Sequence, residues 1–73
     1  MKNNFLKALK SHYESQINEA VATLDLYFNR SVGIGEHSDL LMELKKYTEL
    51  LDAADSKLET LNKYFNNDGS INK

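Results

Sequence analysis

The chain has 73 residues, which predicts a single domain with a small core, and it has no cysteine, which excludes a disulfide framework and a thiolate zinc site. Nine basic and eleven acidic residues give a formal net charge of −2, which disfavours duplex nucleic acid as a partner. No apolar run is long enough for a membrane span, and the first residues lack the apolar core of a signal peptide, so a cytoplasmic protein is expected.

A first helix is predicted over residues 4–30. Asn3 or Asn4 can cap its start, and neither proline nor glycine interrupts it before Gly33. Its apolar residues recur at steps of three and four, which is the spacing of one helix face. These residues are Leu6, Leu9, Tyr13, Ile17, Ala20, Leu24 and Tyr27.

A glycine bend is predicted over residues 31–38 and a second helix over residues 39–66. Ser38 is the best candidate for its N-cap, and Asp39 would place a negative charge in the first turn, where the helix dipole favours it. The apolar residues follow a heptad pattern typical of a coiled-coil seam. They are Leu40, Leu44, Tyr47, Leu51, Ala54, Leu58, Leu61 and Phe65.

The two seams match each other as an antiparallel hairpin closed by the bend. In that register Ala20 faces Tyr47 and Tyr13 faces Ala54, so large side chains meet small ones, as interdigitated packing requires. A parallel homodimer of single helices would place Ala54 against Ala54 and lose this match. The predicted fold is therefore all-α, an antiparallel two-helix hairpin.

Apolar residues beside the seams exceed what one helix packed on another can cover. Such a surplus indicates a second contact surface, either between copies in a four-helix-bundle homodimer or with a different protein. The predicted interface residues are Phe5, Val21, Phe28, Leu41, Leu50 and Tyr64.

The tail, residues 67–73, is predicted to fray after an Asx turn and Gly69 close the second helix. Its spacing suggests a calcium loop at first, but the first ligand position would fall on Tyr64 and the closing glutamate would lie beyond residue 73.

The bend carries the only residues that suggest ligand chemistry. Gly33 and Gly35 can expose backbone N–H groups ahead of a helix start, which favours an anion. The acidic Glu36 and Asp39 oppose this, and no lysine follows the glycines as in a P-loop. Three interpretations of the bend stay open: a simple chain reversal, a tip that docks on another protein, or an anion-binding site. Candidate binding residues are Arg30, Gly33, Gly35, Glu36, His37 and Ser38.

No catalytic constellation is predicted, because no nucleophile, histidine and carboxylate can be brought together by the hairpin. His37 with Glu36 and Asp39 is a weak metal set, since the other histidine, His12, lies toward the far end. Neither a metal nor another cofactor is expected.

The turn Val32-Gly33-Ile34-Gly35-Glu36-His37, with the flanking residues 26–29 and residues 57–61, resembles a group of short helical-hairpin proteins of tailed bacteriophages. The resemblance implies a phage origin and a hairpin fold, and it carries over no site. The expected function is that of a non-enzymatic accessory protein in the infected cell, which binds itself and a host or phage protein. The alternatives are an oligomeric sponge that sequesters a phosphorylated or nucleotide ligand at the bend, and a minor structural component of the virion.

Overall fold

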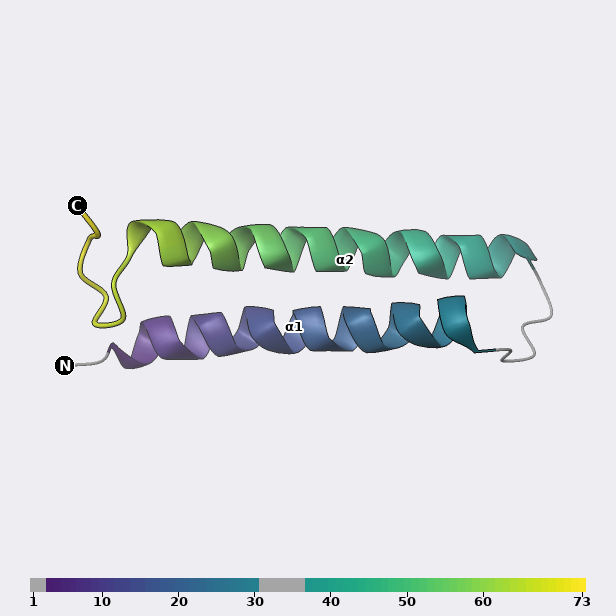
Figure 1. Cartoon of the computed structure of the whole chain (residues 1–73), viewed down its shortest axis with the longest axis horizontal. Helices are drawn as coiled ribbons and strands as arrows, with labels where there is room; N and C mark the ends of the chain where they lie inside the picture. Colours follow the sequence, from purple (N-terminus) through teal and green to yellow (C-terminus); the bar gives the residue numbers. More distant parts are fainter. Residues whose placement is uncertain (1–2, 31–36) are drawn as a thin grey trace.

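The computed structural model describes residues 3–30 and 37–73, and it describes the side chains of all of these except residues 37 and 38. Two helices, α1 (Asn4–Asn29) and α2 (His37–Tyr64), lie side by side in opposite directions (Figure 1). The molecule is a rod of 51 × 16 × 16 Å. The predicted all-α hairpin is confirmed. We call the end where the chain passes from α1 to α2 the bend end and the opposite end the open end.

Helix α1 begins where an asparagine can cap it. The side-chain oxygen of Asn3 accepts a hydrogen bond of 3.0 Å from the backbone N–H of Leu6, which satisfies one of the unpaired donors of the first turn. At the other end Arg30 turns to an extended backbone, and its N–H still donates to the carbonyl of Leu26 at 3.1 Å. The helix therefore ends at Asn29, one residue before the predicted boundary.

Helix α2 begins at His37 and places Asp39 in its first turn, as the helix dipole favours. Ser38 lies inside that first turn, so it is not the residue that precedes the helix, and its predicted role as N-cap is wrong. The helix ends at Tyr64, two residues before the predicted boundary. The N–H of Phe65 still donates to the carbonyl of Leu61, but the N–H of Asn66 donates to the carbonyl of Ser70 in the tail.

The core between the helices is thin. Its buried residues are Ala20 (0% exposed), Leu24 (7%) and Ala54 (1%), all of which the periodicity placed in the seam. Leu9 and Phe65 are exposed, although both were predicted in the seam, because two helices leave the sides of their contact open. The remaining seam residues are half-buried: Leu6, Tyr13, Ile17, Tyr27, Leu40, Leu44, Tyr47, Leu51, Leu58 and Leu61.

The tail after α2 folds into a small hairpin, so the expected frayed end is wrong. Phe65 pairs with Ile71 in an antiparallel bridge, and Asn66 and Gly69 close the turn between them through a 2.8 Å hydrogen bond. Gly69 has a φ of +88°, as a three-residue hairpin loop with a glycine in the left-handed region requires. The predicted Asx turn is present, because Asp68 accepts from the N–H of Ser70 at 2.8 Å.

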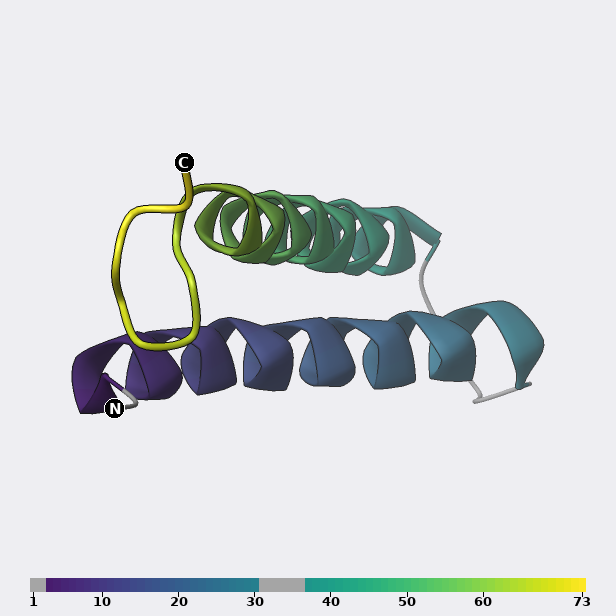
Figure 2. The same cartoon turned by 60° about the vertical axis from the view of Figure 1, so that its left-hand side comes forward.

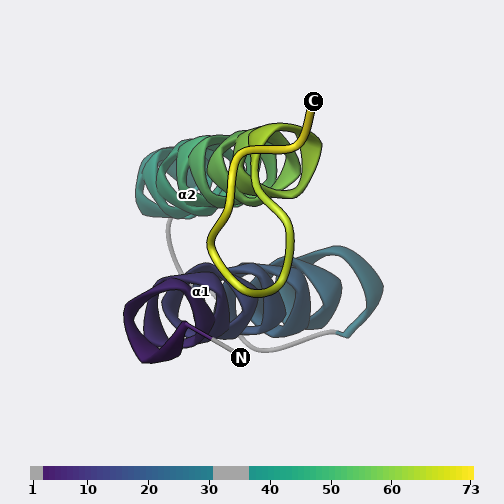
Figure 3. The ribbon, with the colours of Figure 1, turned by 90° about the vertical axis from the view of Figure 1, so that its left-hand side faces the viewer.

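This tail hairpin contacts both helices at the open end. It caps α2, since Asn72 donates from its backbone N–H to the carbonyl of Tyr64 and from its side chain to the carbonyl of Lys63. It also reaches across to the start of α1, as the two turned views show (Figures 2 and 3). A Cβ added at Gly69 would lie 2.7 Å from Nδ2 of Asn3, so the tail packs directly on the residue that caps α1.

Candidate binding surfaces

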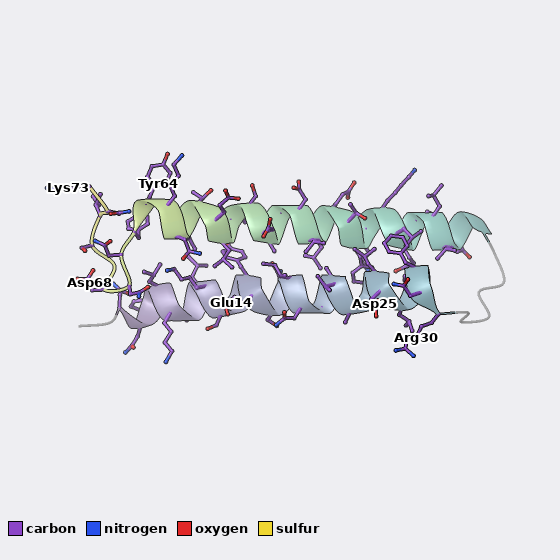
Figure 4. The ribbon with its side chains drawn as sticks, viewed as in Figure 1. Glu14, Asp25, Arg30, Tyr64, Asp68 and Lys73 are labelled. Carbon is purple, nitrogen blue, oxygen red and sulfur yellow. The ribbon has the colours of Figure 1, made fainter. Side chains whose placement is uncertain are left out.

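The predicted ligand site at the bend falls largely outside the described residues. Gly33, Gly35 and Glu36 lie there entirely, and the side chains of His37 and Ser38 do too. Arg30 is exposed and points away from the seam at the end of α1 (Figure 4). The structure therefore places Arg30 beside the bend, and it brings no described residue of this set together with another.

Most of the predicted interface residues have exposed side chains. Phe5 is 89% exposed and Phe28 is 64% exposed, which is far more than apolar side chains in a closed core show. Val21, Leu41 and Tyr64 are also exposed, and Leu50 is half-buried. Tyr64 points away from α1 at the open end (Figure 4). Other exposed apolar residues of the described chain lie outside this set: Leu9, Leu26, Met42, Phe65 and Ile71.

By their helical positions, three of these side chains fall on one side of the seam toward the bend end, and we call this set the bend patch: Val21, Phe28 and Leu41. Val21 and Phe28 are two helical turns apart on α1 and share a face. Phe28 follows the buried Leu24 by four residues, and Leu41 precedes the seam residue Leu44 by three. In antiparallel helices these offsets fall on the same side of the seam.

On the other side of the seam, in the half toward the open end, the two helices form an open groove of about 450 Å³. Leu9 and Tyr13 line it from α1, and Lys57 and Leu61 line it from α2. The amino group of Lys57 lies 5.7 Å from the centre of the Tyr13 ring, which ties the two helices at this level. Phe5 sits one turn before Leu9 on the same face of α1, so it extends the groove toward the open end.

The ionisable side chains that the structure describes lie at the surface. Among the described residues no polar or charged residue is buried, and none of the described His, Asp and Glu side chains gather in a group of three or more that could hold a metal. The pKa of Asp68 is lowered because the side chain and the backbone N–H of Ser70 donate to its carboxylate. This shift belongs to the turn of the tail hairpin, and its physical cause is local.

Sequence reasoning missed the groove and the tail hairpin. Leu9 and Leu61 were both assigned to the seam, and only the three-dimensional packing shows that they border an open groove. For the tail, the sequence did hold a signal: Asp68-Gly69 stands between the apolar Phe65 and Ile71, which is a spacing typical of a short hairpin.

Within the parts of the chain that the structure describes, no helix is long and apolar enough to cross a lipid bilayer. Comparison of the chain with protein-family models, with curated proteins and with solved structures finds no match.

Proposed function

We propose that this chain is a non-enzymatic binding protein, in which two hairpins associate as a four-helix bundle and the bend patch binds another protein. The observation that supports it best is the mismatch between core and surface. Two of the three residues that are buried in the described part of the chain are alanines, while Phe5, Phe28 and Leu41 lie more than half exposed. A hairpin that buries so little of its apolar surface gains stability when further helices cover it.

The surface area supports the same proposal. The chain exposes 5810 Å². A compact monomer of its mass, 8.4 kDa, is expected to expose about 4,600 Å². The excess of about 1,200 Å² per chain is the area that each subunit of a stable homodimer buries. The radius of gyration, 16.1 Å, likewise exceeds the value of about 11 Å expected for a compact chain of this length.

The bend patch is the surface proposed for a second protein. Its side chains are apolar, exposed and grouped on one side of the molecule, as in protein-binding grooves that accept an amphipathic segment. A phage origin is part of the proposal, and it rests only on the resemblance of the turn and of residues 26–29 and 57–61. The absence of catalysis is part of the proposal, and the exposure of the described ionisable groups supports it, since catalytic groups are usually partly withdrawn from water.

Size-exclusion chromatography with light scattering tests the self-association. We expect a mass of twice 8.4 kDa at micromolar protein concentration. A well-folded species with the mass of one chain would refute the four-helix bundle.

Affinity capture with matched variants tests the bend patch. A genuine partner is retained by the wild type and by Met42→Ser, which removes an exposed apolar side chain elsewhere, and is lost from Phe28→Ser. A protein that binds the wild type, Met42→Ser and Phe28→Ser equally does not use the bend patch. If every captured protein behaves in this way, the proposed role of the bend patch is wrong.

A further inference from the structure

We infer that the second copy packs on the groove side of the hairpin, with both bends at the same end, so that Phe5 of each copy meets Leu61 and Tyr64 of the other. This inference rests on the proposed self-association and adds to it the face, the orientation and the contact residues. We call this side the groove face.

On α1, charged residues are distributed unevenly between the two sides of the seam. On α1 the flank positions of the groove face are Leu9, Gln16 and Thr23, at heptad spacing, and none of them is charged. The opposite flank of α1 begins with Lys7 and Glu14. Packing a second hairpin on the charged flank would remove these ions from water, which costs free energy unless each finds a partner. The groove face has no such cost on α1.

On α2 both flanks carry charge. At heptad spacing the flank on the groove face contains Glu43, Leu50, Lys57 and Tyr64, and the opposite flank contains Leu41, Thr48, Asp55 and Asn62. The two flanks differ in the half toward the open end, where the groove face has the aromatic Tyr64 and the opposite flank has the polar Asp55 and Asn62. Lys57 already lies over the Tyr13 ring, an arrangement that lets its aliphatic stem line an apolar contact while its amino group remains near water.

The apolar surface of the groove face is concentrated in the half toward the open end, where the groove lies and where Phe5 is 89% exposed. Rotating one copy by half a turn about the long axis places this half against its own counterpart and sets α1 beside α2 of the second copy. Since α1 begins at Asn4 and α2 ends at Tyr64, Phe5 then lies level with Tyr64.

A head-to-tail arrangement would instead place Phe5 beside the bend end of the second copy. The groove face there carries Thr23 and Glu43, so an aromatic side chain would be buried against polar groups. The aligned arrangement pairs apolar surface with apolar surface, and for that reason the geometry favours it.

Two variants test the face. Phe5→Ser removes a side chain that contributes little to the isolated hairpin, and Thr23→Lys places a charge on the same flank. Each is expected to raise the dissociation constant of the dimer by at least about tenfold. Phe28→Ser, on the opposite side, is the matched control and should leave it unchanged. Helix content, measured by circular dichroism above and below the dissociation constant, confirms that each variant folds.

Spin labels test the orientation, because the chain has no cysteine and single cysteines can be introduced cleanly. Asn4→Cys and Asn18→Cys place labels at the open end and near the middle of α1, both at exposed positions. In the aligned dimer the two label pairs report similar distances. In a head-to-tail dimer the Asn4 labels are separated along the rod by a further distance of about 38 Å, from 1.5 Å per residue.

A strictly monomeric protein would overturn both the proposed self-association and this inference. A dimer that survives Phe5→Ser and Thr23→Lys, or one that gives the head-to-tail distances, would overturn the inference alone and leave the self-association standing.

Discussion

The substitution Gly69→Ala tests whether the tail hairpin and the start of α1 stabilise each other. Gly69 has a φ of +88°, so an alanine there is strained by about 1–2 kcal/mol. The new Cβ would also lie 2.7 Å from Nδ2 and 3.0 Å from Cβ of Asn3, which forces that side chain to move. If Asn3 then loses its bond to the N–H of Leu6, the missing cap costs a further ~1 kcal/mol. The total expected loss is about 2–3 kcal/mol.

A double-mutant cycle with Asn3→Gly separates the two contributions. Glycine is a tolerated N-cap, so Asn3→Gly alone should cost only a few tenths of a kcal/mol, about 0.3. It also removes the Cβ and the amide that Gly69→Ala would strike. In this background Gly69→Ala should cost only the backbone strain, about 1–2 kcal/mol, which leaves a coupling of about 1 kcal/mol between the two sites.

Urea denaturation followed by circular dichroism measures all four proteins, at one fixed concentration because self-association contributes to apparent stability. Equal costs of Gly69→Ala in the two backgrounds would refute the reasoning. They would mean that the tail hairpin makes no contact with α1 that affects folding.

Three further predictions concern the core and the tail. Leu24→Ala should lower the free energy of unfolding by about 2–5 kcal/mol, because Leu24 is the one large apolar side chain among the buried residues that the structure describes. Ala20→Leu or Ala54→Leu should cost about 1–3 kcal/mol by overpacking, and a stabilising effect in urea denaturation would show that the alanine sites hold unfilled space. The pKa of Asp68 is lower in the folded chain than its value of 3.8 in the unfolded chain, so its bonds to Ser70 stabilise the tail above that pH and are lost as the pH falls through the folded pKa. An acid titration of the Ser70 amide by NMR should show this loss below about pH 4 and not in Asp68→Asn, and an unchanged wild-type signal down to pH 2 would contradict it.

The hairpin architecture could be predicted because its determinants are local and periodic. The steps of three and four that contain Ala20, Leu24 and Ala54 identify the buried stripe directly, and all three are buried in the structure. The helix ends were less accurate. The end of α2 at Tyr64 depends on hydrogen bonds made by the tail that follows it, and cap residues alone locate helix ends only to within one or two residues.

The tail shows a different limit. Asp68-Gly69 between two apolar residues favours a hairpin, but the same glycine also fits the end of a helix, and local chemistry cannot decide between the two. In the structure the tail hairpin also packs on Asn3, and this contact joins opposite ends of the chain and has no local signal. The candidate surfaces likewise combine features with a local signal and features without one. The exposure of Phe5 and Phe28 could be expected from the width of the apolar stripes, whereas the groove depends on which residues α2 places beside Leu9.

The tail hairpin covers the open end of the molecule, next to the part of the groove face that carries Phe5. Tail residues bind the last carbonyls of α2 and pack on the cap of α1, so both helices are held in place where Phe5 and the groove lie. A surface that is already ordered loses less conformational entropy when it binds than a frayed helix end would. Gly69→Ala should therefore weaken association of the proposed dimer as well as folding, whereas Phe5→Ser should weaken association and leave the isolated hairpin's helix content unchanged. Finding both effects would assign the tail hairpin the role of ordering the groove face for its partner.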